Sequence, residues 1–355
     1  MRRTSAAQLA ADAGVTRQTI YAIEDGSFVP NTAISLRLAR ALNVTVEEIF
    51  SITDERPNAP VRTHLFNSAE PSNKGQLVRL CQVNERLVAV PVSFLPTYLP
   101  PIDGIIESKS GSTAWIEPPT DLPKNGKRLL LAGCDPALSL LNGELSASEM
   151  EIIDIASSSR CALKWLKQGR VHVAGSHLFD RVTGDYNLPF IKRLFPKGSI
   201  RVVTFAVWEQ GLVLPLGNPK RVRSLADLSR KKITFINREK GSGSRDVLDS
   251  GLREAGIDAK QIRGYQSIAH GHLPAAYAVA TGTADCCIAT RSAARCFGLD
   301  FVPLAVERFD LSFTKRSLEL PAAKALLDLL NRASFRKKLQ AIAGYDTAHT
   351  GQVLV

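Results

Sequence analysis

The stretch that decides the fold is TFINREKGSGSRDVLDSGL, residues 234–252. It reads as a strand, a glycine-serine turn and then a helix. A helix that starts in this way leaves free backbone N–H groups at its N-terminus, where the helix dipole favours negative charge. The order G-x-x-x-x-G-K-[ST] of a Walker motif is not present. The stretch therefore predicts a cradle for a small anion, with Arg245 beside it.

The residues from Lys127 onward alternate between strand and helix patterns. KRLLLAG, VHVAG, KITFIN and the longer RVVTFAVWEQGLVLPL read as strands, whereas DPALSLLNGEL and SRDVLDSGLREAG read as helices. Such alternation predicts an α/β domain with a largely parallel sheet. Two further strand ends, at residues 132–141 and 174–180, lead through small residues toward expected helices. We expect all three strand ends to converge on one oxyanion pocket.

The totals fit a chain of two or three folded domains. It has 355 residues, of which 45% are hydrophobic and 22% charged. No apolar run approaches the roughly 18 residues of a membrane span, and the first ten residues lack a signal-peptide core. We therefore predict a cytoplasmic protein without a membrane partner. Six cysteines without C-x-x-C spacing are expected to be reduced and mostly buried.

The formal charge of +11 is only weak evidence for a polyanionic partner. Residues 5–26 contain a motif that gives stronger evidence. In SAAQLAADAGVTRQTIYAIEDG, Ser5 and Gln8 form a capping box, and Gly14 ends a short helix. Thr16 then caps a second helix, so the pair forms a helix-turn-helix. TAISLRLARAL and VTVEEIF, with the capping box of Thr45 and Glu48, complete a small helical bundle. On the second helix, the side chains expected to point outward are those of Arg17, Gln18, Thr19 and Tyr21.

Residues 9–50 are similar to the Xre, or lambda-repressor-like, helix-turn-helix family over nearly their whole length. The resemblance implies that the second helix of the motif enters the major groove of double-stranded operator DNA. Arg17 and Gln18 would then reach base edges and Thr19 would lie near a phosphate. A homodimer is expected, because such proteins usually read two half-sites. The full set of predicted DNA-binding residues is Thr16, Arg17, Gln18, Thr19 and Tyr21.

The family carries another helix before the position of Ser5, where this sequence has only MRRT. In the family that helix covers the motif helices and commonly supplies a basic partner for the residue at the position of Glu24. We expect the true start to lie upstream. An upstream coding sequence without an apolar, helix-spaced segment would contradict this expectation. The alternative is that the N-terminal helix-turn-helix domain no longer binds DNA. The predicted DNA-binding domain is residues 1–52, without its first helix.

Residues 53–126 are predicted to be a linker and a small β-containing connector. Residues 51–76 are rich in Pro, Asn and Ser, which is typical of a linker. LVRLCQVNERLVAVPV then reads as two strands around the turn Asn84–Glu85. No function is indicated for this region.

A second family resemblance covers residues 127–315. The segments AGCDPALSLL, VHVAGSHLFD, TGDYNLP, WEQGLVLPLGNP, FINREKGSGSRDVLD, HGHLPAAYAVATGTADCCIA and FVPLAVERFDL resemble, in order, the periplasmic-molybdate-binding-like domain that is fused to helix-turn-helix heads in bacterial regulators. The resemblance implies a type II periplasmic-binding-protein fold for residues 127–355, with two α/β lobes joined by crossing strands. The ligand would lie between the lobes.

The predicted ligand contacts are the small and polar residues at the three strand ends. We expect Asp135 to cap the helix at Pro136 rather than to contact the anion, which its carboxylate would repel. The predicted set is Cys134, Asp135, Ser176, His177, Ser242, Gly243, Ser244 and Arg245.

Four histidines raise the question of a metal. His172, His177, His270 and His272 have no cysteine or carboxylate cluster at suitable sequence spacing. We therefore predict no metal and read them as ordinary hydrogen-bonding residues, with His177 and His270 as candidates for ligand contact.

The combined interpretation is a ligand-responsive transcriptional regulator with no catalytic residues and no cofactor beyond a bound ligand. The family favours molybdate or tungstate as that ligand. Backbone N–H groups, serines and an arginine would equally hold sulfate, phosphate or a small carboxylate. One alternative is a cytoplasmic ligand-binding module with a defective head. An enzyme on the same fold is the other, although no nucleophile elbow, carboxylate pair or Ser/His/Asp arrangement is visible.

Overall fold

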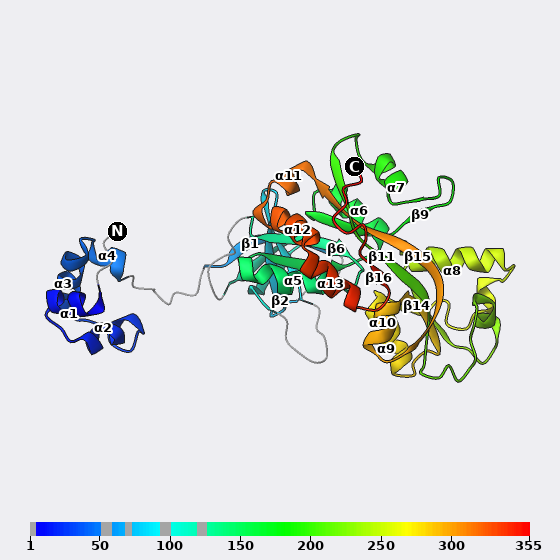
Figure 1. Ribbon diagram of the computed structural model, residues 1–355, viewed down its shortest axis with the longest axis horizontal. Coiled ribbons are helices and arrows are strands. Elements are labelled where there is room, and N and C mark those ends of the chain that lie inside the picture. Colours follow the sequence, from blue (N-terminus) through cyan, green and yellow to red (C-terminus); the bar gives the residue numbers. More distant parts are fainter. Residues whose placement is uncertain (1–4, 51–58, 68–72, 93–100, 119–125) are drawn as a thin grey trace. The chain divides into compact units, whose positions relative to one another are not determined.

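The computed structural model shows the chain as two units, Met1–Pro57 and Asn58–Val355. Figure 1 gives the labels of the helices and strands, which are used below. The structure describes residues 5–50, 59–67, 73–92, 101–118 and 126–355.

The smaller unit is the predicted helical bundle. Ser5, Thr16 and Asn31 each accept a hydrogen bond from a backbone N–H in the first turn of the following helix, and Thr45 and Glu48 form the reciprocal capping box. Gln8 departs from the prediction, because its side chain donates to Asp12. Ala10, Ala13, Ile20 and Leu38 form the core. The helices are α1 (Ala6–Ala13), α2 (Arg17–Glu24), α3 (Thr32–Leu42) and α4 (Val46–Ile49).

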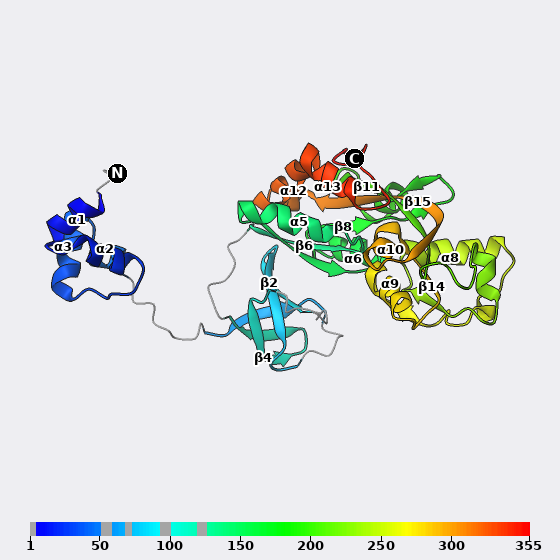
Figure 2. The ribbon, with the colours of Figure 1, turned by 60° about the horizontal axis from the view of Figure 1, so that its bottom comes forward.

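The connector of the larger unit is a closed five-stranded barrel with strand order β1-β3-β2-β4-β5. Figure 2 shows it around the labels β2 and β4. The two strands around Asn84 and Glu85 are confirmed as β2 and β3. The prediction that residues 51–76 are only linker is wrong, because β1 pairs with β3 and β5, which follow it in the chain. The strands are β1 (Val61–Leu65), β2 (Leu77–Val83), β3 (Arg86–Pro91), β4 (Gly104–Ser110) and β5 (Thr113–Glu117).

The rest of the larger unit is built on a mixed sheet with the strand order β13-β12-β14-β11-β15-β8-β6-β7, with β16 paired to β11. The pairs within each half, such as β6 with β7 and β12 with β14, are parallel. The α/β prediction is therefore confirmed, but the sheet is mixed rather than largely parallel, because β11 and β15 pair antiparallel with each other and with β14 and β8. The strands are β6 (Arg128–Gly133), β7 (Glu151–Ala156), β8 (Val173–Ser176), β11 (Ile200–Leu214), β12 (Phe235–Arg238), β13 (Ile268–Ala269), β14 (Cys286–Thr290), β15 (Asp300–Thr314) and β16 (Tyr345–Asp346); β9 (Phe179–Asp180) and β10 (Asp185–Tyr186) form a separate pair.

Helices cover both faces of each half of the sheet. In β6, Leu129 and Leu131 face the core around α5 and α12, whereas Leu130 and Ala132 face the core around α6, as the two-residue period of a strand requires. In β14, the adjacent Cys286 and Cys287 likewise face opposite cores. The helices are α5 (Leu138–Leu145), α6 (Ser159–Lys167), α7 (Leu188–Leu194), α8 (Gly243–Glu254), α9 (His272–Ala280), α10 (Arg291–Cys296), α11 (Lys315–Leu318), α12 (Pro321–Asn331) and α13 (Ala333–Ala341).

Two long antiparallel strands connect the halves. β11 and β15 pair over their full length, and β15 also pairs with β8 while β11 also pairs with β14. We call the half with β6, β7 and β8 lobe 1, and the half with β12, β13 and β14 lobe 2. These are the two lobes and crossing strands that the family resemblance implied.

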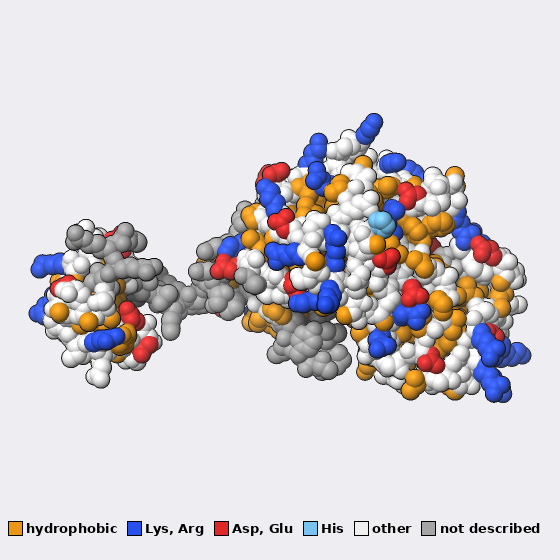
Figure 3. Space-filling view, viewed as in Figure 1, with side chains coloured by type: hydrophobic (Ala, Val, Ile, Leu, Met, Phe, Trp, Pro, Cys, Tyr) orange, Lys and Arg blue, Asp and Glu red, His pale blue; other side chains and the backbone are white. Residues whose placement is uncertain are grey.

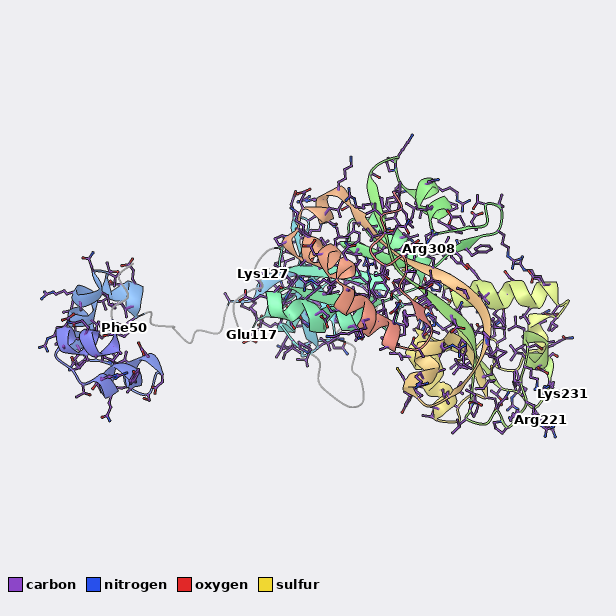
Figure 4. The ribbon with its side chains drawn as sticks, in the orientation of Figure 1. Phe50, Glu117, Lys127, Arg221, Lys231 and Arg308 are labelled. Carbon is purple, nitrogen blue, oxygen red and sulfur yellow. The ribbon has the colours of Figure 1, made fainter. Side chains whose placement is uncertain are left out.

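The cysteines, the basic runs and the helix lengths can be compared with the sequence predictions. All six cysteines are free thiols, and only Cys296 is exposed. Lys and Arg side chains are spread over the face of the larger unit in Figure 3, and Lys231, in the run SRKKI, lies at the outer end of lobe 2 in Figure 4. None of the helices in the described part of the chain has the length and apolarity that a bilayer crossing needs.

An ion-pair cluster joins the barrel to lobe 1. Asp103 of the barrel accepts hydrogen bonds from the guanidinium groups of Arg79, at 2.9 Å, and of Arg128, at 2.8 Å, and from the Leu80 N–H, at 2.8 Å. Arg79 and Arg128 also pair with Glu151 of lobe 1. The Asp103 side chain is only 13% exposed. Loss of its charge would therefore leave two arginines incompletely paired at this contact.

We predict that Asp103→Ala lowers the free energy of unfolding by about 3 kcal/mol, because removal of one member of a mostly buried ion pair leaves its partners uncompensated. Urea denaturation at neutral pH measures this. Glu107→Ala is the matched control, since Glu107 is an exposed acid on β4, the strand that begins directly after Asp103. It should change stability by less than about 0.5 kcal/mol. Equal losses in the two variants would contradict the role given to the cluster.

The same cluster predicts a pH dependence. Burial raises the pKa of Asp103, but the Leu80 N–H and the two arginines lower it more strongly, so the net shift is downward from 3.8. A carboxyl with a depressed folded-state pKa contributes stability above its unfolded pKa and loses it as the pH falls through the folded value. The stability difference between wild type and Asp103→Ala should therefore be constant near neutrality and shrink below about pH 4. A difference that shrinks near pH 6 instead would contradict this.

Candidate functional site

The crossing strands place three polar side chains at the junction of the lobes. Trp208 and Glu307 are direct partners in the register of β11 and β15, and Gln210 follows Trp208 two residues later on β11. All three are at most 2% exposed. Because residues two apart on a strand point to the same side, Trp208 and Gln210 share one face of β11.

Two of the predicted strand ends bring their polar residues to this junction. Cys134 follows β6 and His177 follows β8, and Cys134 Sγ lies 3.2 Å from His177 Nε2. The other ring nitrogen, Nδ1, lies 2.7 Å from Glu307 Oε2. The His177 ring also meets the Trp208 ring edge to face, with centroids 5.0 Å apart. The result is a buried chain of thiol, imidazole and carboxylate.

The electrostatics of this chain favour a charged imidazole. Burial lowers the pKa of His177, but Cys134 and Glu307 raise it more strongly, to about 10. The imidazolium compensates the buried Glu307 carboxylate, which would otherwise be costly to desolvate.

The third strand end brings the N-terminus of α8 against His177. A Cβ atom on Gly243 would lie 2.4 Å from His177 Nδ1, so only glycine allows this approach. Ser242 accepts a hydrogen bond from the Arg245 N–H as the N-cap, and Ser244 donates one to the Gln210 side-chain oxygen. The glycine-serine turn of the predicted cradle therefore lies at the junction of the lobes.

His272, the first residue of α9 in lobe 2, completes the cluster. It is 1% exposed, and neither ring nitrogen has a hydrogen-bond partner among the residues that the structure describes. Its ring centroid lies 5.3 Å from that of Trp208 and 5.9 Å from that of His177. Burial, together with Arg238 and His177 nearby, lowers the pKa of His272 well below its usual value, so the ring is neutral.

Several N–H donors at the junction are also without acceptors. Within the described ranges, this holds for Trp208 Nε1, Gln210 Nε2 and Arg238 Nη1, all of them buried. Arg238 pairs through its other nitrogens with Glu239, at 2.9 and 3.0 Å. A buried donor without an acceptor costs about 1–3 kcal/mol. Such a concentration of unmet donors is typical of a binding site rather than of a structural core.

The remaining predicted residues fall into different environments. Ser176 is fully buried, and its hydroxyl lacks a partner among the described residues. The Arg245 guanidinium is already engaged: it pairs with Asp249 at 3.0 Å and stacks on Tyr265. The charges of Arg245 and Arg238 are thus both compensated by a carboxylate, but Arg238 keeps one buried N–H, on Nη1, without an acceptor among the described residues.

Two expectations at the strand ends are wrong. α5 begins at Leu138 without a side-chain cap, and Asp135 instead accepts hydrogen bonds from the Ala137 N–H, at 2.8 Å, and from the Tyr345 hydroxyl, at 2.5 Å. Burial raises the pKa of Asp135 to about 7. The strand end at residues 174–180 leads into the pair β9–β10 rather than into a helix.

The histidines also differ from expectation. His172 fits the prediction of an ordinary hydrogen-bonding residue, since its Nδ1 accepts from the Leu130 N–H at 2.9 Å. His270 is exposed. His272 contradicts that prediction, because it is buried without a partner in the described part of the chain. Sequence spacing showed no cluster of metal ligands, yet the fold brings Cys134, His177 and His272 together, with ligand atoms within 4.8 Å of one another.

Sequence reasoning missed Trp208, Gln210, Arg238 and Glu307. Each lies in a segment quoted for the family resemblance, such as WEQG, FINREKG and AVERFDL. The available signal was a polar residue inside an otherwise apolar strand. Such a residue requires a buried partner or a ligand.

The predicted DNA-contacting residues lie on and next to α2. Thr16, Arg17, Gln18 and Tyr21 are exposed and Thr19 is half-buried. The Arg17 guanidinium donates to the Tyr21 hydroxyl at 3.0 and 2.7 Å. This contact links Arg17 to a side chain one helical turn further along α2.

The close approach of α8 to His177 can be tested at Gly243. We predict that Gly243→Ala lowers the free energy of unfolding by about 1–3 kcal/mol, because the added methyl group overpacks the junction. Gly143→Ala is the matched control, since Gly143 lies within α5 and a Cβ there would meet nothing within 4 Å. That variant should be neutral or stabilised by up to about 1 kcal/mol. Thermal and urea denaturation measure both, and a neutral Gly243→Ala would contradict the close contact.

Comparison with known proteins identifies two family regions. Residues 143–331, just over half of the chain, match the family described as PBP superfamily domain. Residues 1–49 match the family described as helix-turn-helix.

Parts of the chain are similar to individual curated proteins and to one solved structure. The uncharacterized protein YvgK of Bacillus subtilis (strain 168) is 32% identical over 234 residues, which are 66% of this chain and 75% of YvgK. The uncharacterized HTH-type transcriptional regulator YgzD of the same organism is 40% identical over 42 residues, which are 12% of this chain and 64% of YgzD. The structure of the tungstate ABC transporter from Geobacter sulfurreducens aligns with a TM-score of 0.43 at 20% identity, covering 59% of this chain and 96% of that chain. From the family matches, the chain belongs to the PBP superfamily and carries a helix-turn-helix domain at its N-terminal end.

Proposed function

We propose that this protein is a DNA-binding transcriptional regulator whose PBP-like domain responds to a small anion held between its lobes. The two family regions support the coarse statement of a helix-turn-helix joined to a ligand-binding fold. The observation that carries the ligand proposal is the set of buried, acceptor-free N–H donors on Trp208, Gln210 and Arg238.

The chemistry of these donors favours an anion with several oxygen atoms. An indole N–H, an amide N–H and a guanidinium N–H come from three positions around one junction, and the N-terminus of α8 adds its dipole. Arg238 is paired with Glu239, so the N–H groups rather than a large net positive charge would hold the ligand. A tetrahedral oxyanion such as molybdate or tungstate fits this chemistry. Sulfate, phosphate and small carboxylates are the alternatives.

Closure of the lobes is the proposed response. Arg160 of lobe 1 pairs with Asp246 of lobe 2 at 3.0 Å, and Arg181 pairs with Glu254 at 2.8 Å. All four side chains are about half exposed, and exposed ion pairs contribute only about 0–1 kcal/mol each. A ligand that satisfies several buried donors would therefore dominate the balance between open and closed states.

The regulator proposal includes a homodimer in the cytoplasm. The two helix-turn-helix domains of a dimer bind the two half-sites of an operator. A change in the PBP-like domain would alter DNA affinity by changing the relative placement of these two domains. The coupling would equal the difference in ligand affinity between the DNA-bound and free forms.

One contact chain supports the enzyme alternative. Cys134, His177 and Glu307 lie in the order of nucleophile, base and orienting carboxylate. We propose binding rather than turnover, because these groups lie among acceptor-free donors in a binding-protein fold. The enzyme alternative would be supported if the protein hydrolysed thioesters or amides of small acids with steady turnover, and if Cys134→Ser lost this activity.

We predict a thermal shift on addition of one oxyanion from a panel of molybdate, tungstate, sulfate, phosphate and small carboxylic acids. At about 100 times its dissociation constant the ligand should stabilise the fold by roughly 2.7 kcal/mol. Trp208→Phe removes one hydrogen-bond donor while keeping an aromatic ring, and should make the free energy of ligand binding less favourable by about 1–2 kcal/mol. Trp165→Phe is the control, since Trp165 is a partly buried residue packed against the core around α6, and it should leave ligand affinity unchanged. An unchanged affinity in Trp208→Phe would contradict the assigned pocket.

We predict that the purified full-length chain selects a specific sequence from a random pool of DNA duplexes. Arg17→Ala should weaken binding to that sequence by about 1–3 kcal/mol, the usual value of a bidentate base contact. Arg40→Ala removes the same charge from α3 and should retain most of the sequence preference. Fluorescence anisotropy at fixed salt measures both, and ligand-induced thermal shifts should be intact in both variants. Failure to select any sequence would support the alternative that the helix-turn-helix domain no longer binds DNA.

A further inference from the structure

We propose that Cys134, His177 and His272 form a binding site for a thiophilic transition-metal ion of the Zn²⁺ class, located between the lobes. Their ligand atoms, one sulfur and two imidazole nitrogens, all lie within 4.8 Å of one another and are buried. Thiolate and imidazole are the ligands that Zn²⁺ prefers in proteins. This inference goes beyond the proposed function and requires neither DNA binding nor the anion.

The environment of His272 points to a missing ligand. Its ring is 1% exposed, and both nitrogens lack a partner in the part of the chain that the structure describes. A buried imidazole without hydrogen bonds is unfavourable unless an occupant compensates it. If Cys134 were an enzymatic nucleophile, His177 and Glu307 would have roles as its base and orienting carboxylate. The burial of His272 without a partner among the described residues would then have no explanation. A metal ion accounts for all of these residues.

The contact between His177 and Glu307 has the form of a metal-supporting hydrogen bond. Metal-binding histidines commonly donate their second ring N–H to a carboxylate, which fixes the tautomer and directs the first nitrogen at the metal. His177 presents Nδ1 to Glu307, at 2.7 Å, and Nε2 toward Cys134. The proton shared in the Cys134–His177 contact would be released when the metal binds.

The distances indicate how the site would operate. With bonds of about 2.0–2.3 Å in tetrahedral geometry, ligand atoms lie roughly 3.3–3.8 Å apart. Cys134 Sγ and His177 Nε2, both in lobe 1, are already 3.2 Å apart. His272 belongs to lobe 2, so it is the ligand that must move inward. Metal binding would therefore draw the two lobes together.

The charges at the site are compatible with a divalent cation. A Cys134 thiolate and the Glu307 carboxylate supply two negative charges, and nearby Arg238 is compensated by Glu239. Three protein ligands leave a fourth position open, as in zinc sites that bind an exchangeable molecule. The acceptor-free donors of Trp208 and Gln210 lie beside this cluster, so water or a small anion is the expected fourth ligand.

Titration of the metal-free full-length protein with Co²⁺, in a reducing buffer without DNA or added oxyanion, tests the site. We expect thiolate-to-cobalt charge-transfer absorption that saturates at about one equivalent per chain and is removed by excess Zn²⁺. Cys134→Ser should abolish this absorption. His272→Ala should weaken Co²⁺ binding by at least about tenfold, and Glu307→Gln by about 10–100-fold.

Controls separate loss of the site from loss of the fold. Cys296→Ser removes the exposed thiol and should leave the cobalt spectrum unchanged. Melting curves of every metal-free variant test whether it remains folded. Absence of charge-transfer absorption in the wild type, or its persistence in Cys134→Ser, would overturn the metal site. Anion-induced thermal shifts and DNA selection are separate measurements, so they would still decide the regulator proposal.

Discussion

The antiparallel pairing of β11 with β15 is the constraint on which the rest of the larger unit depends. These strands belong to both halves of the sheet, so they fix which side chains can meet at the junction of the lobes. Arg308 on β15, labelled in Figure 4, pairs with Asp310 on the same strand and with Asp185 of β10. Because Trp208 and Glu307 are register partners, a slip of one residue between the two strands would place their side chains on opposite faces of the sheet.

The junction contains buried polar groups that have no hydrogen-bond partner among the residues that the structure describes. The nitrogens of Trp208, Gln210, Arg238 and His272 are buried without a hydrogen-bond partner among the described residues, and a buried polar group without a partner is costly. Under the proposed function, the same groups would give the bound anion its binding energy. The stability of a closed state would then depend on occupancy of the site, as a sensor requires. The exposed ion pairs between the lobes are too weak to replace the ligand.

The parts of the fold that depend on local chemistry could be predicted from the sequence. Caps such as Thr16 and Thr45 act within one helical turn, and the strand, glycine turn and helix around Gly243 are contiguous. The site depends on longer-range relations. Glu307 lies 130 residues from His177, its hydrogen-bond partner, and no spacing rule connects them. The first barrel strand was missed for the same reason, because its hydrogen-bond partners lie in β3 and β5.

The central claim is that occupancy of the junction changes the affinity of the helix-turn-helix domain for DNA. The most direct test measures the dissociation constant of the full-length protein for its selected operator, at fixed salt, with and without the ligand that gives a thermal shift. The account predicts a change of about 5–150-fold, which corresponds to a coupling free energy of about 1–3 kcal/mol. Equal dissociation constants with the ligand bound and absent would contradict it.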